Sequence, residues 1–349
     1  MATSEYSVNH AMARQEWSKK LMKEALEETY CFRFMGESAN SPIQIKNELK
    51  ESGYKVTFGL RMQLSGAGRS GDATLEGHEE ALTVYTDSVV IDQLRHAVRT
   101  HGRASEQRVP FSTREEAKDG LKDWWSRRMD QSWLNQVCGI SAGAAGGLAY
   151  TGLNEVSAVD SDHIVFNGET TEAALSDSAG NTFSLTFFDE AIEKARTLDP
   201  IIKPVRVGGQ NKYIAMLHPY QVKDLRTQYS STEITWYDTQ RALVEGGKGI
   251  NSPIYNGALG EYNGIVIHES ENVPISPTNT QAYRAVLLGA QSSVCAFGKN
   301  YSKNSMDWVE ELYDYQNQLG VAAGMVFGLK KTRFNNKDYA SIVMASGAG

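Results

Sequence analysis

The sequence predicts an α+β protein that combines one long helix with several strands. Two observations carry this prediction. Residues 55–64 alternate apolar and polar side chains, which is the period of a strand with one covered face. Residues 112–139 carry an apolar stripe at helical spacing between two capping signals. Further strand-like runs, such as residues 262–270, follow in the C-terminal half.

The composition is that of a soluble globular protein. The 349 residues are 41% hydrophobic and 22% charged, enough for one elaborate domain or two ordinary ones. No apolar run approaches the roughly 20 residues of a membrane helix. The N-terminus lacks the basic start and apolar core of a secretory signal, so we expect the protein to stay in a cytoplasm. Cys31, Cys138 and Cys295 form no CxxC pair and are expected to be buried thiols.

The charge pattern argues against strong binding to nucleic acids. The formal net charge is −7, and the Lys and Arg residues are scattered through the chain. Nonspecific binding to nucleic acids depends on clustered basic side chains that neutralise phosphates. A protein whose main task is to grip DNA or RNA is therefore not expected.

The first fifty residues are expected to form an arm. Trp17, Leu21, Ala25 and Leu26 have the spacing of one helix face, and residues 35–44 then have the composition of a loop. A single amphipathic helix followed by a loop cannot bury its own apolar face. We therefore expect the arm to pack on something else.

A long hairpin is predicted after the arm. One face of its first strand holds Val56, Phe58, Leu60, Met62 and Leu64. A glycine-rich turn region follows at residues 65–77, and Thr and Val residues mark a second strand at residues 79–91. A two-stranded ribbon is marginally stable alone, so we expect the hairpin to lie on a neighbour.

The clearest helix lies between Ser112 and Gly139. Ser112 and Glu115 have the spacing of a capping box, and Gly139 is placed to cap the C-terminus. The apolar stripe comprises Ala117, Leu121, Trp124, Trp125, Met129, Trp133 and Val137. About 26 residues at 1.5 Å each give a length of roughly 39 Å, so we expect a structural spine.

The rest of the chain alternates between shorter elements. A helix is predicted from Thr186 to the Asp199–Pro200 pair, and two strands surround the Gly208–Gly209 turn. A short helix begins at Pro219, directly after His218. Further strands are expected at residues 262–270, 283–291 and 338–346. His218, on the strand face that carries Ile214 and Met216, is expected to serve packing or a backbone hydrogen bond.

The patterns hold little enzyme chemistry. The glycines of residues 139–152 follow a helix and precede no Gly-Lys-Ser/Thr, which favours a connection over a phosphate loop. The seven histidines show no metal-binding spacing, and no Gly-x-Ser-x-Gly elbow is present. His268 and Glu269 are adjacent on a strand and point to opposite faces. We expect no enzyme activity, cofactor or metal, and a hydrolase that uses His268 or His218 remains the alternative.

Several stretches over nearly the whole chain resemble one family. They include EWSKKLMKEA near the start, GYKVTFGLRMQLSGAGRSGDATLEGHEE, QLRHAVRTHG, KYIAMLHPYQVKDLR, NGALGEYNGIVIHES, RAVLLGAQSSVCAFGK and FGLKKTRFNNKDYASI. With these stretches the chain resembles the major capsid proteins of tailed bacteriophages, which have the HK-97-like fold, and is most similar to the N-4-like podophage coat proteins. The motifs concern packing and turns and carry no chemical signature.

The resemblance implies a subunit of five segments. These are an N-terminal arm at residues 1–52, an extended hairpin or E-loop with its return at 53–108, the spine helix of a peripheral domain at 109–142, an axial domain at 143–300, and C-terminal strands of the peripheral domain at 301–349. Gly66, Gly68, Gly71 and Gly77 would let the hairpin tip change shape as a shell expands.

The resemblance also implies a function. The chain would be a major capsid protein that self-assembles as hexamers and pentamers into an icosahedral head around double-stranded DNA, which it would contact weakly. Its partners would be copies of itself, a portal, a scaffold and cement proteins, and assembly would take place in the cytoplasm of a host bacterium. A minor head protein of the virion is the alternative. The expected contacts between subunits are Trp17, Arg61, Trp124, Trp125, Arg127 and Trp236.

Overall fold

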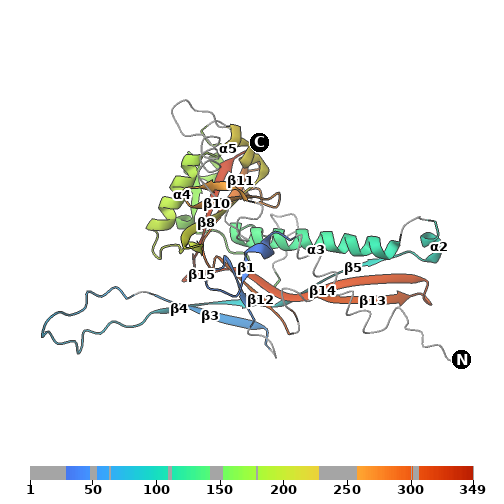
Figure 1. Ribbon diagram of the computed structural model, residues 1–349, viewed down its shortest axis with the longest axis horizontal. Helices are drawn as coiled ribbons and strands as arrows, with labels where there is room; N and C mark the ends of the chain where they lie inside the picture. Colours follow the sequence, from blue (N-terminus) through green and yellow to red (C-terminus); the bar gives the residue numbers. More distant parts are fainter. Residues whose placement is uncertain are drawn as a thin grey trace.

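A computed structural model describes most of the chain. The described residues are 29–47, 53–62, 64–108, 112–141, 152–177, 180–227, 258–299, 301 and 306–348. Two sheets, a long helix and a projecting hairpin make up this part (Figure 1). Among its helices, none is both long and apolar enough to cross a membrane. The predicted helix of the arm and most of residues 139–152 lie outside the described residues.

The first sheet has six strands in the described part of the chain, built around one long strand. β14 (Gln318–Lys331) pairs with β12 (Ser293–Phe297), β13 (Asp307–Tyr313) and β5 (Asp92–Arg99), all antiparallel. The two short strands β1 (Met35–Gly36) and β2 (Ile43–Lys46) extend the sheet beyond β12. The short helix α2 (Arg103–Glu106) follows β5.

The spine helix is confirmed as α3 (Thr113–Cys138), and it lies along the first sheet (Figure 1). The Ser112 side chain accepts the backbone N–H of Glu115, and Gly139 closes the helix in the left-handed conformation. Leu121, Trp125 and Met129 are buried in a core shared with β14. The same core includes the 3-10 turn η1 (Cys31–Phe34), which precedes β1.

The second sheet has seven strands in the described residues, in the order β6-β17-β11-β8-β10-β9 with β7 beside β8. They are β6 (Ile164–Phe166), β7 (Val205–Val207), β8 (Gln210–Leu217), β9 (Ala258–Tyr262), β10 (Ile265–Glu269), β11 (Ala282–Leu288) and β17 (Ser341–Gly347). The predicted strands around Gly208–Gly209 and at residues 262–270, 283–291 and 338–346 are thus confirmed.

Helices cover both faces of the second sheet. α4 (Leu185–Thr197) begins at the cap residue Ser184, two residues before the predicted Thr186, and buries its apolar side against one face. On the other face, Ile214 and Met216 of β8 join the core beneath α3. α5 (Pro219–Thr227) starts at Pro219 as predicted. The short turns η2 (Ser161–His163) and η3 (Glu172–Ala174) flank β6.

The chain crosses between the two sheets more than once. β12 lies within the predicted axial segment 143–300, yet it pairs with β14 in the first sheet. β17 lies within the predicted C-terminal segment 301–349, yet it pairs with β11 in the second sheet. A boundary at residue 300 therefore does not separate the two sheets. The five segments that the resemblance implies remain a prediction.

The passage from β14 to β17 is a small hairpin of β15 (Arg333–Phe334) and β16 (Lys337–Asp338). Its Asp338 and the adjoining Lys331 are buried. Lys331 Nζ lies 2.9 Å from Asp338 Oδ2, and Arg333 Nε lies 3.0 Å from Asp338 Oδ1. Because burying a charge is costly without a partner, these pairs hold the junction between the sheets in one arrangement.

Candidate functional site

The predicted hairpin is formed by β3 (Lys55–Arg61) and β4 (Val84–Val90), and it projects away from both sheets (Figure 1). The two strands are antiparallel, with a register from Lys55 opposite Val90 to Arg61 opposite Val84. In the described chain they form a sheet of only two strands. A ribbon of this kind needs support from outside itself.

The base of the hairpin is fixed to the body. Val56 and Val89 are buried against β12. The side chain of Asn154 accepts the N–H of Val90 and donates to its carbonyl, at 2.8 and 2.7 Å. The carboxylate of Asp87 pairs with Lys330 and accepts the backbone N–H of Arg333 at 3.0 Å. The direction in which the hairpin leaves the body is thus set by contacts with the first sheet, with Asn154 and with the junction between the sheets.

The described residues give the outer part of the hairpin no such cover. Val56 on the predicted apolar face is buried, Phe58 and Leu60 are partly buried, and Leu64 is exposed. Leu64, Leu75, Leu82 and Val84 are each more than half exposed. Contiguous exposed apolar surface is typical of sites where proteins contact one another.

The tip of the hairpin is organised by Glu80. Its carboxylate accepts the backbone N–H groups of Ser65 and Gly66 at 2.8 and 2.7 Å, so it joins the two sides of the tip. These hydrogen bonds hold the pKa of Glu80 below its ordinary value. Gly68 and Gly71 have left-handed backbone angles that favour glycine. The tip from residue 65 to 83 carries Asp72, Glu76, Glu79 and Glu80 against a single Arg69, so it is acidic.

A groove lies on the face of the first sheet that turns away from α3. Its volume is about 410 Å³, and its floor includes Gly320, Ala322 and Gly324, which alternate along β14 with the buried residues that face the helix. A Cβ added at Gly320 would lie 2.7 Å from the Tyr313 ring. The small residues therefore create the hollow.

The two walls of the groove carry opposite charges. Arg95 and Arg99 line the side formed by β5, and Asp307 and Glu311 line the side formed by β13. The Arg99 guanidinium lies 4.4 Å from the centre of the Tyr313 ring, which holds it over the groove. The groove can thus accept an apolar segment with acidic groups on one flank and basic groups on the other.

The residues predicted to join subunits have different surroundings. Arg61 is exposed at the outer end of β3, and Arg127 is exposed on α3. Trp124 is half-buried and stacks on His96, with ring centres 4.4 Å apart. Trp17 and Trp236 lie outside the described residues. The contact role of Arg61, Trp124 and Arg127 remains a prediction.

Trp125 requires a correction. It is 1% exposed and packs within the subunit's own core, where a neighbour has no access to it. The sequence places Trp124 and Trp125 on the same broad stripe, but adjacent helix residues point about 100° apart, and only Trp125 faces β14.

The two histidines of the hydrolase alternative are held by packing contacts. His268 is fully buried at the end of β10, its Nδ1 pairs with the Tyr30 hydroxyl, and its ring centre lies 5.2 Å from that of Phe34. Glu269 is exposed, so the pair does face opposite ways as predicted. His218 Nδ1 accepts the backbone N–H of Tyr220 at 3.3 Å, which confirms the expected backbone hydrogen bond.

Sequence reasoning missed the groove and the polar contacts that anchor the hairpin. The signal for the groove was present in the alternation of Gly and Ala along residues 320–324, which gives a strand one face without bulk. No local pattern marks Asn154 or Asp87, because their partners are 64 and 243 residues away in sequence.

Comparisons with known proteins identify relatives. Residues 5–347 match a family described as phage capsid protein. The chain is 26% identical over 360 residues to the major capsid protein of Pseudomonas phage KPP25, an alignment that covers 91% of this chain and 89% of the relative. The capsid of Ralstonia phage GP4 has a TM-score of 0.78 at 30% identity, covering 100% of this chain and 96% of that one. The Cyanophage Pam1 capsid has a TM-score of 0.71 at 20% identity, covering 99% of both chains, and shows the same fold.

Proposed function

The chain belongs to the phage capsid protein family, and from this premise we propose that its copies close the shell as hexamers and pentamers in which each hairpin lies on a neighbouring subunit. The chain is a major capsid protein with the HK-97-like fold, a structural component of the icosahedral shell, and therefore part of the virion.

The proposal rests on the exposure of apolar side chains on the outer half of the hairpin. Its apolar side chains Leu64, Leu75, Leu82 and Val84 are exposed in the isolated subunit, whereas its base is tied to the body. A surface of this kind is costly in a lone chain and becomes favourable once a neighbour covers it. The many repeated contacts of a shell stabilise each subunit by mass action.

The groove on the first sheet is the best match for the hairpin on the neighbouring copy. Its small-residue floor suits an extended apolar segment, and its Arg95 and Arg99 wall suits the acidic tip. Arg61, at the other end of the exposed ribbon, would lie toward a carboxylate such as Glu311. In this pairing, the carboxylate would be the contact partner of Arg61, which the sequence predicts to join subunits.

The other partners follow from the role of a shell. We expect a portal, a scaffold and cement proteins to meet the shell, and assembly to occur in the cytoplasm of the host bacterium. The net charge of −7 favours weak, non-sequence-specific contact with packaged double-stranded DNA. We assign no catalytic role to the chain, because the described contacts of His218 and His268 account for them as packing residues.

Electron microscopy of the purified chain, with and without its scaffold, tests the proposal. We expect shells, tubes or rings. The matched variant replaces Leu75 and Leu82 by Ser, which removes apolar surface from the tip without touching the buried base. We expect this variant to remain folded by circular dichroism and to lose closed shells. A wild-type chain that stays a monomer of 38.5 kDa under all conditions would refute the proposal.

A further inference from the structure

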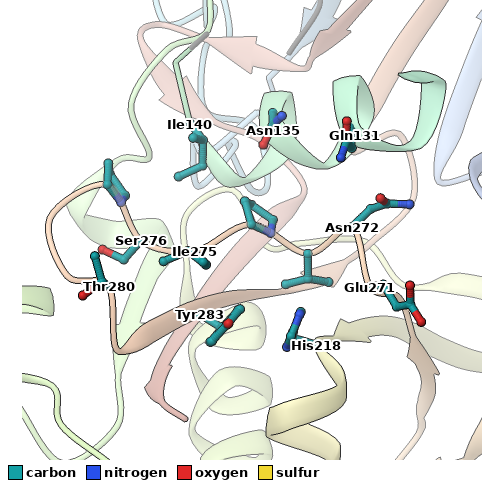
Figure 2. Close-up of a pocket in the computed structure, with 13 residues that line it drawn as sticks. Gln131, Asn135, Ile140, His218, Glu271, Asn272, Ile275, Ser276, Thr280 and Tyr283 are labelled. Atoms are coloured by element: carbon teal, nitrogen blue, oxygen red, sulfur yellow. The ribbon is translucent and has the colours of Figure 1, made fainter. Parts of the chain in front are cut away.

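A pocket of about 530 Å³ lies where the two parallel strands β8 and β10 end, beside the last turns of α3. Figure 2 shows Gln131 and Asn135 of α3 on one side of it and His218, Tyr283 and Glu271 on the other. In sheets with parallel strands, ligands commonly bind beyond the carboxyl ends of the strands. None of the proposed contacts between subunits uses this pocket.

Among the residues that the structure describes, the lining of the pocket is rich in oxygen acceptors, and His218 is its one basic side chain. The amides of Gln131, Asn135 and Asn272 and the carboxylate of Glu271 line it, whereas no described Lys or Arg does. The lining thus carries one negative charge and several carbonyl oxygens. Such a set repels an anion and favours a positively charged group.

Asn135 is a buried polar side chain that lines the pocket. It is 5% exposed, lies against the pocket, and the described residues offer its side-chain amide no hydrogen bond. Its side chain lines the pocket, so its amide is open to a ligand placed there. The amide oxygen can accept from an N–H donor placed in the pocket.

Aromatic rings form the wall opposite α3. His218 stacks on Tyr283 with ring centres 4.0 Å apart, and both residues line the pocket. Burial lowers the pKa of His218, with Glu271 opposing the effect, so the ring is neutral at neutral pH and does not repel a cation. Aromatic faces near a carboxylate are a common setting for ammonium and guanidinium groups.

From these contacts we propose that the pocket binds the guanidinium or ammonium group of an organic cation. The carboxylate of Glu271 supplies the charge, Asn135 and Gln131 accept hydrogen bonds, and the His218–Tyr283 stack covers the apolar part of the ligand. A basic side chain of a neighbouring protein and a free polyamine present this same chemistry. The inference does not depend on how the hairpins pack in the shell.

Nuclear magnetic resonance of the histidine rings in the full-length protein tests the pocket directly. The signal of His218 is identified by its loss in His218→Asn, and the protein is titrated with arginine amide and with spermidine. We expect saturable shifts of this signal with at least one of the two probes. Tighter binding of arginine amide points to a protein side chain as the natural source, and tighter binding of spermidine points to a polyamine.

Two carboxylate variants separate the pocket from general charge effects. Glu271→Gln should weaken binding about tenfold, because it removes the charged partner. Glu269→Gln is the matched control, since Glu269 is exposed two residues earlier and does not line the pocket. No saturable shift with either probe, or equal weakening by both variants, would overturn the proposal.

Discussion

Lys331 and Asp338 form an ion pair of 2.9 Å between side chains that are 1% and 0% exposed. They lie where the chain passes from the last residue of β14 to the second sheet. Lys331 also donates to the carbonyl of Ala158 at 3.3 Å, and the backbone N–H of Asp160 lies 3.3 Å from Asp338 Oδ2. The pair thus joins three segments at the junction between the sheets.

Replacing Asp338 by Asn should destabilise this junction strongly. The change leaves the buried ammonium of Lys331 without a counter-charge, and removing one partner of a buried pair costs about 3–5 kcal/mol. The measurement is urea unfolding of the unassembled subunit. Lys337→Ala is the control, because Lys337 pairs with Asp162 at the exposed surface, where a pair contributes at most about 1 kcal/mol. Equal losses for the two variants would contradict the role of the buried pair.

His163 should make the same junction sensitive to acid. Its pKa is lowered by burial, opposed by Asp338, Asp160 and Asp162, while Lys331 adds to the lowering. Because the unfolded chain then binds more protons below about pH 6.5, the free energy of unfolding falls as the pH drops through this range. The measurement is the urea midpoint at about pH 7.5 and pH 5.5. His163→Gln should show a smaller loss on acidification, and an unchanged loss would sink the assignment.

Glu80→Gln should loosen the tip of the hairpin and leave its base intact. The neutral amide is a weaker acceptor for the N–H groups of Ser65 and Gly66 than the carboxylate is. Hydrogen exchange followed by mass spectrometry should show faster exchange at residues 64–68 and unchanged exchange at residues 55–58. Glu76→Gln, on the same tip, is the control. Faster exchange along the whole hairpin would mean that Glu80 supports the base as well.

His218→Asn should still allow shells to assemble. Asn keeps a side chain that can accept the N–H of Tyr220, as His218 Nδ1 does, but it cannot transfer protons at neutral pH. Electron microscopy of the variant measures the outcome. Loss of shells in a folded variant would show that the imidazole itself is required.

Local signals in the sequence were enough to predict several elements, whereas residues 35–44, expected to be a loop, contain β1 and the start of β2. Ser112 and Glu115 mark the start of α3 and Gly139 marks its end because capping depends on neighbours within one turn. The alternation of residues 55–61 predicts β3 because strand geometry has a period of two.

Relations between distant segments could not be predicted in this way. The pairing of β17 with β11, the burial of Trp125 rather than Trp124, and the contact of Tyr30 with His268 depend on the tertiary arrangement. The candidate site shows the same limit. Its hairpin was predicted, whereas its groove exists only once β5, β13 and β14 lie side by side.

The proposed contact between the hairpin and the groove predicts a charge-reversal rescue. Arg95→Glu together with Arg99→Glu places four carboxylates around the groove, and Asp72→Lys together with Glu76→Lys makes the tip basic. Each pair of changes alone opposes like charges across the contact. A loss of about 1 kcal/mol per contact raises the critical concentration for assembly roughly fivefold.

The four changes combined should restore assembly, because the tip and the wall are then complementary with their signs exchanged. Sedimentation of assembled shells over a range of protein concentrations measures the effect. Arg226→Glu, an exposed change on α5 in the other half of the subunit, should leave the critical concentration unchanged. Because salt screens charges at a solvent-exposed contact, the rise in critical concentration caused by each separate pair of changes should become smaller at high ionic strength. Failure of the combined variant to improve on both separate variants would place the tip somewhere other than this groove.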